Sequence, residues 1–300
     1  MKKGKNIGIV MYMLAGAGLL LTGFTTAQSG LSEECRGEYE NAVAMYDELG
    51  NMGFDGFCPM DYQVAFSDGE TDRVIGYHDG DYKTEQRDAV YDGLVGSIYE
   101  NEGRYEVIVP DYEIWLATGS SAPLSAVIWH ESFHAYQITT FDPMRQMPEA
   151  MMSETQLAQK LDGDVKQKRL FEKELAILGR ITDEENTCDA TDIAIEYIRV
   201  KKERDALLDQ AFRASEDYYA MLEGTAYYIE SKAVCFVNGE KAYQENYIDT
   251  AVTYADGNAK YYRLGMLECL LLDQLDPDWK SGYAFDQPLD ALISDYVMER

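Results

Sequence analysis

The spacing of apolar residues divides the chain into a shorter β-prone part and a longer helical part. From Pro123 onward, apolar residues recur at intervals of three and four, which is typical of amphipathic helices. This pattern predicts helices over residues 122–140, 149–178, 190–213, 215–236, 258–275 and 288–298. We therefore expect the second part of the chain to be mostly helical.

Before Pro123, short β-prone runs alternate with Asp-Gly turns. The runs predicted to be strands are Tyr62–Phe66, Arg73–Tyr77, Tyr105–Val109 and Tyr112–Ala117. Two helices are also expected in this part, over residues 32–49, where Ser32 can serve as the N-cap, and over residues 89–100. Strands first and helices afterwards predict a predominantly helical α+β fold with a small N-terminal sheet.

The first residues have the pattern of an export signal. Three lysines precede the apolar run Ile7–Phe24, and Thr25-Thr26-Ala27 supplies small residues for cleavage. The pattern predicts a signal peptide over residues 1–27 and an exported protein that is secreted, periplasmic or held in the cell envelope. The apolar run is also long enough for an uncleaved N-terminal anchor. If the signal is cleaved, no stable membrane insertion is expected.

The charge excludes one class of partner. The 300 residues include 26 Lys and Arg against 54 Asp and Glu, a net charge of −28. Such an acidic chain repels phosphate backbones, so nucleic-acid binding is not expected. With 46% apolar residues, the chain can bury a core and is not of the disordered class.

The five cysteines do not form a zinc ribbon, because no Cys-x-x-Cys pair exists. Their odd number leaves at least one thiol unpaired in a monomer. For an exported chain we expect Cys35 to pair with Cys58 and Cys188 with Cys235. Cys269 lies in an apolar helical run, which predicts a buried free thiol.

One motif carries the candidate chemistry: His130-Glu131-Ser132-Phe133-His134, which has the form H-E-x-x-H. Helical positions four apart share a face, so the two imidazoles can bind one metal ion, with Glu131 directed at a water on that ion. Catalytic zinc needs a third protein ligand and an open position. The alternative is two ordinary helix histidines, one of them buried and hydrogen-bonded.

The third ligand is expected to be a carboxylate. The metzincin pattern requires Gly at position 137 and His at position 140, where this chain has Gln137 and Thr140. His78, the only other histidine, lies in an Asp-Gly turn sequence and is expected to be exposed.

The stretch from Glu223 to Glu230 reads Glu-Gly-Thr-Ala-Tyr-Tyr-Ile-Glu. It resembles the Glu-Gly-x-Ala-x-Tyr-x-Glu segment of aminopeptidase N type enzymes, which are gluzincin metallopeptidases. The resemblance implies that His130, His134 and Glu223 bind Zn²⁺ and that Glu131 is the general base. Glu230 is the alternative ligand. The resemblance covers two short segments, and the interval between them is longer than in the family.

The resemblance also implies a fold. We expect a single zincin-like catalytic domain over residues 28–300, with an N-terminal lobe (28–140) that holds the sheet and the H-E-x-x-H helix, and a helical lobe (141–300). Gly224 would let its helix pack closely against the H-E-x-x-H helix. The stretch Tyr112–Ala117 resembles the zincin edge strand, which binds an extended substrate.

Gluzincins generally stabilise the oxyanion with a Tyr or His from the C-terminal lobe. Tyr262 and Arg263, at the start of the helix predicted over residues 258–275, are the candidates here. The aminopeptidase motif that precedes the zinc helix in the family is absent, so trimming from the N-terminus is not implied.

These features predict an exported zinc-dependent metallohydrolase, foremost a peptidase. Its partner would be a peptide or protein substrate, hydrolysed by zinc-activated water with Glu131 as general base. The alternative is a non-catalytic cell-envelope binding protein on a zincin-like scaffold. A third hypothesis, a helical envelope protein without zinc, requires the motif to be accidental.

Overall fold

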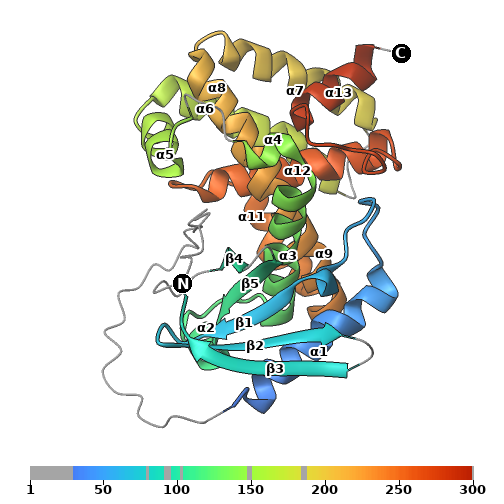
Figure 1. The fold of residues 1–300 in the computed structure, drawn as a ribbon. Helices are drawn as coiled ribbons and strands as arrows, with labels where there is room; N and C mark the ends of the chain where they lie inside the picture. Colours follow the sequence, from blue (N-terminus) through green and yellow to red (C-terminus); the bar gives the residue numbers. More distant parts are fainter. Residues whose placement is uncertain are drawn as a thin grey trace. The chain divides into compact units, whose positions relative to one another are not determined.

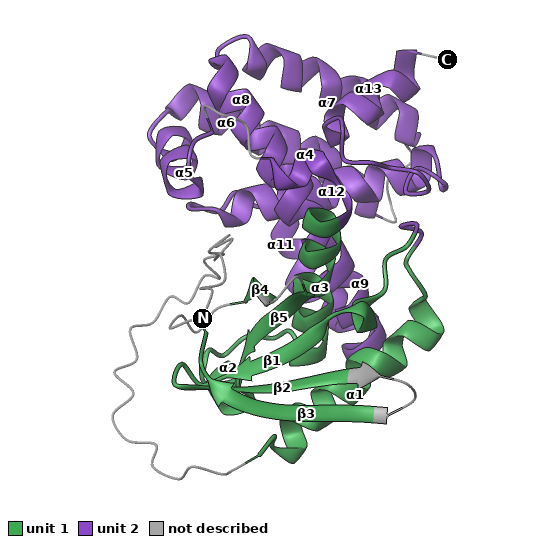
Figure 2. Ribbon diagram, in the orientation of Figure 1, with its two compact units in different colours: residues 1–52, 56–139 green, residues 53–55, 140–300 purple. Residues whose placement is uncertain are grey.

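The structure is a computed structural model that describes residues 30–78, 81–90, 96–101, 104–146, 151–183 and 188–298. The signal peptide predicted over residues 1–27 lies outside these ranges. The chain is α+β and mostly helical, with an N-terminal mixed sheet followed by a helical region (Figure 1). It divides into two compact units, residues 1–52 with 56–139 and residues 53–55 with 140–300 (Figure 2).

The first unit contains a five-stranded sheet and three α-helices among its described residues. Its elements are α1 (Glu33–Leu49), η1 (Pro59–Asp61), β1 (Gln63–Ser67), β2 (Thr71–His78), β3 (Asp81–Asp88), β4 (Ser97–Asn101), β5 (Arg104–Pro110), α2 (Tyr112–Ala117) and α3 (Leu124–Thr140). The strand order is β3-β2-β1-β5-β4. Only β1 and β5 pair in parallel, and the other neighbours are antiparallel.

Helices α1 and α3 pack on each other beside the sheet (Figure 1). The indole Nε1 of Trp129 on α3 donates to the carbonyl of Ala42 on α1 at 2.9 Å, and the backbone N–H of Ser125 donates to the Glu38 carboxylate at 2.8 Å. Phe57 packs edge-on against the Trp129 ring, with centroids 5.7 Å apart. These contacts fix α3, which carries the H-E-x-x-H motif, within the core of the first unit.

Two secondary-structure predictions in the first unit are wrong. Tyr112–Ala117 forms α2, not a strand, because Asp111 caps a helix there by accepting from the backbone N–H of Glu113. The helix predicted over residues 89–100 is wrong at its end, where β4 begins at Ser97. Residues 91–95 of that prediction lie outside the described ranges.

The described residues of the second unit form helices joined by loops, and none of them forms a strand. Its elements are α4 (Asp142–Arg145), α5 (Glu154–Asp162), α6 (Val165–Leu178), η2 (Gly179–Thr182), α7 (Ala190–Asp205), α8 (Gln210–Tyr219), η3 (Ala220–Gly224), α9 (Thr225–Asn238), α10 (Glu240–Tyr243), η4 (Gln244–Ile248), α11 (Asp249–Ala251), α12 (Ala259–Leu275) and α13 (Leu289–Met298). The helices predicted over residues 258–275 and 288–298 are confirmed almost to their ends, whereas those predicted over 149–178 and 190–213 are shorter in the structure. The break expected near residue 214 is absent, because α8, η3 and α9 follow one another from Gln210 to Asn238, and the short helices between Glu240 and Ala251 were not predicted.

Aspartate caps explain the shorter helices. Asp164 accepts from the N–H groups of Lys166 and Gln167 and starts α6 directly after α5 ends, so the segment 149–178 is not one helix. Asp209 accepts from the N–H of Phe212 at 2.7 Å and starts α8 in the same way. Both capping aspartates are exposed, and such a break is polar and local, so the period of apolar residues continues across it.

A fully buried arginine joins three helices of the second unit. The Arg204 guanidinium on α7 donates to Glu174 on α6 at 2.7 Å and to both oxygens of Glu216 on α8, the nearer at 2.5 Å. It also lies 5.0 Å from the ring centre of Phe171. All three charged side chains are 0% exposed, so their pairing offsets the cost of removing charge from water.

Two glycines set the closest helix contact in the second unit. A Cβ added at Gly224 would overlap the backbone of Gly265 on α12, and a Cβ at Gly265 would overlap the carbonyl oxygen of Ala220. Gly224 therefore serves the packing of η3 on α12. The sequence predicts that Gly224 packs against the H-E-x-x-H helix. In the structure, the residue that lies against Gly224 is Gly265 of α12.

Gly265→Ala is expected to destabilise the protein by about 1–3 kcal/mol, because a methyl group has no room beside the Ala220 carbonyl and α12 must shift. Gly37→Ala is the matched control, since Gly37 is also helical but has nothing within 4 Å of an added Cβ. The control should be neutral or slightly stabilising. Urea unfolding, monitored by circular dichroism, would measure the unfolding midpoints of the parent and of both variants. A midpoint of Gly265→Ala equal to that of the parent would contradict the packing argument.

The five cysteines form no disulfide in the structure, so the predicted pairs Cys35–Cys58 and Cys188–Cys235 are wrong. The Cys35 thiol instead donates weakly to Asp111, and that of Cys235 to Glu240. Cys269 is buried, as predicted. Within the described ranges, no helix combines the length and the apolar character needed to cross a membrane.

Candidate metal centre

Helix α3 places the H-E-x-x-H motif in the interior. Every residue from Leu124 to Ile138 is buried, so the helix is surrounded by protein on all sides. His130 is 4% exposed, and Glu131 and His134 are each 1% exposed. Three polar side chains at this depth need partners, because an unpaired polar group in the interior costs free energy.

The two imidazoles converge through their Nε2 atoms, which lie 3.0 Å apart. Two nitrogens bound to one tetrahedral zinc ion at about 2.0–2.1 Å would be about 3.3 Å apart, so a small adjustment suffices. On the other side of the ring, Nδ1 of His134 lies 2.9 Å from Oε1 of Gln137. The amide oxygen can only accept, so Nδ1 carries the proton and the lone pair of Nε2 could bind a metal ion.

Glu131 lies against the backbone at the start of β4. A Cβ added at Gly96, the residue before β4, would overlap the Glu131 carboxylate. The backbone of Gly96 therefore forms part of the wall around this carboxylate. Any side chain at position 96 would push Glu131 out of its place.

Glu223 is held by η3, a π-helical turn between α8 and α9. The wider turn is consistent with a functional position, since π-helical turns occur often at functional sites. Glu223 is 0% exposed. Its carboxylate and the ring nitrogens of His130 and His134 offer ligand atoms that all lie within 4.8 Å of one another.

A second carboxyl group of the helical unit, Glu154 at the start of α5, lies in the electrostatic range of Glu223. Burial, followed by the negative charge of Glu223, raises the pKa of Glu154 to about 8. The side-chain amide of Asn258 donates to Glu154 at 2.6 Å, which holds this carboxyl in place. A cation bound beside two such acids would offset the repulsion between them.

Glu230, the alternative ligand, is bound elsewhere. Its carboxylate accepts a hydrogen bond from the Tyr247 hydroxyl at 2.5 Å, and it does not belong to the metal-binding group found among the described residues. The structure thus brings together the two histidines with Glu223 and gives Glu230 a different role.

The two oxyanion candidates lie in the first turn of α12. The ring of Tyr262 contacts that of Tyr227 edge-on, with centroids 5.8 Å apart. Arg263 donates from Nη1 to the carbonyl oxygen of Thr253 at 2.6 Å, and burial lowers its pKa. These contacts within the helical unit account for both side chains, and their assignment to the oxyanion stays a prediction.

Sequence reasoning missed three residues that the structure places around this centre: Gln137, Gly96 and Glu154. Gln137 carried a usable signal, because it lies one helical turn after His134 and so shares its face. Gly96 and Glu154 carried no such signal in the sequence. Contacts between distant segments bring Gly96 near Glu131 and Glu154 near Glu223.

The geometry defines an α+β protein with a buried His-His-Glu group that could hold a metal ion. Comparisons with known proteins found no relative: no protein-family model matches the chain, and no significant match is found among curated proteins or solved structures. The residues of the centre are therefore the basis from which a function can be inferred.

Proposed function

We propose that the protein is an exported zinc metallopeptidase of the gluzincin type, with a zincin-like fold. The observation that carries the proposal is the buried group of His130, His134 and Glu223, with Glu131 next to the first histidine on the same helix. Export follows from the predicted signal peptide over residues 1–27.

The donor atoms favour a catalytic zinc ion over a structural one. Two imidazole nitrogens and one carboxylate leave a coordination position open, whereas structural zinc is usually closed by four ligands that include cysteine. The same three donors also suit non-haem iron. Glu131 favours the zinc hydrolase, because hydrolysis needs a base beside the metal ligands and an iron oxygenase does not.

A bound zinc ion would lower the pKa of water and polarise a carbonyl oxygen. Glu131 accepts the proton of the attacking water and returns it to the amine that leaves. Gly96 holds the Glu131 carboxylate in position, and Gln137 fixes the proton on Nδ1 of His134. Tyr262 or Arg263 would stabilise the oxyanion.

Strand β4 is proposed as the strand that binds the substrate, in place of Tyr112–Ala117. It lies at the edge of the sheet, and Gly96, directly before it, contacts Glu131. An extended peptide that pairs with the outer edge of β4 would run past the base. This arrangement favours a peptide or protein as the substrate.

Metal analysis of the purified protein tests the proposal. We expect about one zinc ion per chain in the parent and loss of zinc from His134→Ala, because two remaining ligands hold zinc poorly. His78→Ala is the matched control, since it removes the third histidine of the chain and should keep the ion. Zinc-free parent protein after metal supplementation, or full zinc content in His134→Ala, would refute the centre.

A further inference from the structure

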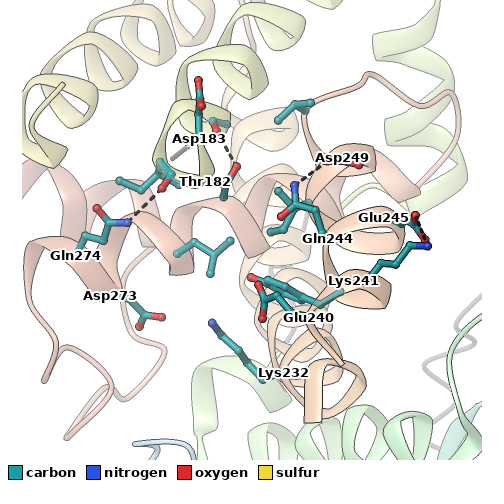
Figure 3. Close-up of a pocket in the computed structure, with 16 residues that line it drawn as sticks. Thr182, Asp183, Lys232, Glu240, Lys241, Gln244, Glu245, Asp249, Asp273 and Gln274 are labelled. Carbon is teal, nitrogen blue, oxygen red and sulfur yellow. Dashed lines mark hydrogen bonds and ion pairs between the residues drawn. The ribbon is translucent and has the colours of Figure 1, made fainter. Parts of the chain in front are cut away.

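A large cavity lies wholly within the helical unit. It has a volume of about 1110 Å³ and is formed by η2, α9, α10, η4, α11 and α12 (Figure 3). None of the proposed metal ligands lines it, and neither does Glu131. The cavity is therefore a candidate binding site separate from the metal centre.

Acidic side chains outnumber basic ones in the lining of this cavity. The charged residues of the lining are five carboxylates and two lysines: Asp183, Glu240, Glu245, Asp249, Asp273, Lys232 and Lys241. Glu245 pairs with Lys241 at 3.6 Å, and Asp273 pairs with Lys280, which lies outside the lining. An excess of negative charge remains after this pairing, and it favours a ligand that is a cation.

Glu240 and Asp249 accept hydrogen bonds from neutral donors. The Cys235 thiol donates to Glu240 at 3.2 Å, and the Gln244 amide donates to Asp249 at 2.7 Å (Figure 3). A neutral donor occupies one lone pair of a carboxylate but leaves its negative charge uncompensated. These two acids are therefore the best placed in the lining to pair with a cation.

The neutral polar side chains of the lining favour a ligand that donates hydrogen bonds. The Thr182 hydroxyl donates to the carbonyl oxygen of Gly179 at 2.8 Å, and the Gln274 amide donates to that of Ile181 at 3.2 Å. Each contact uses a donor hydrogen and leaves the side-chain oxygen able to accept. A ligand rich in donors, such as an ammonium group, fits this lining better than an anion does.

Tyr243 is a lining residue whose hydroxyl has no hydrogen-bond partner among the described residues. The residue is only 9% exposed, and its ring stacks with that of Tyr247, with centroids 6.5 Å apart. Burial, followed by the negative charge of Glu240, raises the pKa of Tyr243, so the hydroxyl stays protonated and neutral. Burying such a group without a partner costs free energy, which a ligand that donates to it would offset.

Lys232 limits where a cation can bind in the cavity. Its ammonium lies 5.3 Å from the ring centre of Tyr228 and 5.6 Å from that of Tyr243, so the aromatic rings hold it in place. Like charges repel, so the positive charge of Lys232 opposes the binding of a cation and favours that of an anion. Removal of this charge therefore distinguishes the two kinds of ligand by the sign of its effect.

We propose that this cavity binds a ligand with more than one alkylammonium group, through the carboxylates of Glu240 and Asp249 and the hydroxyl of Tyr243. Two sources share this chemistry: a peptide segment with neighbouring lysines and a free polyamine. The proposal does not depend on hydrolysis or on the metal centre.

Calorimetric titration of the full-length protein tests the proposal with three probes: N-acetyl-lysyl-lysine amide, N-acetyl-norleucyl-norleucine amide and 1,8-diaminooctane. The lysyl peptide should bind the parent about tenfold or more tightly than the norleucyl peptide, which has the same chain without the ammonium groups. Tighter binding of the lysyl peptide than of the diamine identifies a peptide segment as the source. The reverse order identifies a free polyamine.

Variants locate the binding. Glu240→Gln and Asp249→Asn should each weaken binding of the tighter cationic probe about tenfold, because each removes a charge-assisted hydrogen bond. Tyr243→Phe should weaken it about threefold to tenfold and keeps the ring contacts. Lys232→Met should strengthen it. Glu203→Gln is the matched control, because Glu203 is an exposed acid of the same unit outside the lining, and it should bind as the parent does.

Four results would overturn the proposal. The first is weaker binding of the cationic probe to Lys232→Met, and the second is a loss in Glu203→Gln as large as that in Glu240→Gln. The third is parent-like affinity in both Glu240→Gln and Tyr243→Phe, which would place the probe elsewhere, such as at the metal centre. The fourth is equal affinity of the parent for the lysyl and norleucyl peptides, or no binding of any probe, which needs no variant to fold.

Discussion

Glu131→Gln is expected to abolish peptide hydrolysis while the protein keeps its metal ion. The glutamine has nearly the same shape, so it fits against Gly96 as the glutamate does. It cannot accept a proton from water, and loss of a general base typically costs about 10²–10⁴-fold in rate. Glu131 is not among the proposed ligands, so zinc content should match that of the parent.

The measurement is cleavage of denatured casein and of a quenched fluorescent peptide library, followed with metal analysis of the same samples. Glu113→Gln is the matched control, because Glu113 is an exposed glutamate on α2 of the same unit. Parent-like turnover in Glu131→Gln would refute the mechanism. A parent that holds zinc but cleaves nothing would favour the non-catalytic binding protein.

Glu223→Ala is expected to weaken zinc binding by about 100-fold or more. Loss of a residue that only supports a ligand already costs about 10–100-fold, so loss of a ligand should cost at least as much. Glu230→Ala should bind zinc much as the parent does, because its carboxylate accepts from Tyr247 and lies outside the metal-binding group. Competition with a zinc chelator measures both affinities.

Both variants need the same folding check, since both remove a buried carboxylate. Glu230→Ala leaves the Tyr247 hydroxyl without this partner, so a loss of stability there is expected and does not bear on the metal. Equal zinc affinity of the parent and Glu223→Ala, or a loss confined to Glu230→Ala, would show that the third ligand is misassigned.

The choice between Glu223 and Glu230 shows where sequence reasoning reached its limit. Residues seven apart share one face of an α-helix, so the helical period alone could not separate the two acids. The structure separates them through their partners, which come from segments far away in the chain. The motif on α3 was different, because spacing within one helix is a local property and sequence displays it directly.

The missed strand β3 has a physical explanation. Its residues, from Asp81 to Asp88, are almost all polar, and the side chains from Lys83 to Gln86 are exposed. The strand is held by its backbone pairing with β2 at the edge of the sheet. A strand whose residues are almost all polar does not alternate apolar and polar positions, so the pattern used to predict strands was absent.

The helix predicted over residues 258–275 and the helices flanking Glu223 were recovered because apolar periodicity survives in long buried helices. Their contact at Gly224 and Gly265 could not be predicted, since a glycine in a helix gives no sign of which distant backbone lies against it.

The π-helical turn at η3 affects how related chains would align with this one. A π turn uses one residue more than an α turn, so a relative with an ordinary helix here would align only after a one-residue gap between Ala220 and Gly224. A sequence motif with a fixed spacing between α8 and Glu223 would therefore miss such a relative. Patterns anchored on Glu223 and read only toward the C-terminus would find it.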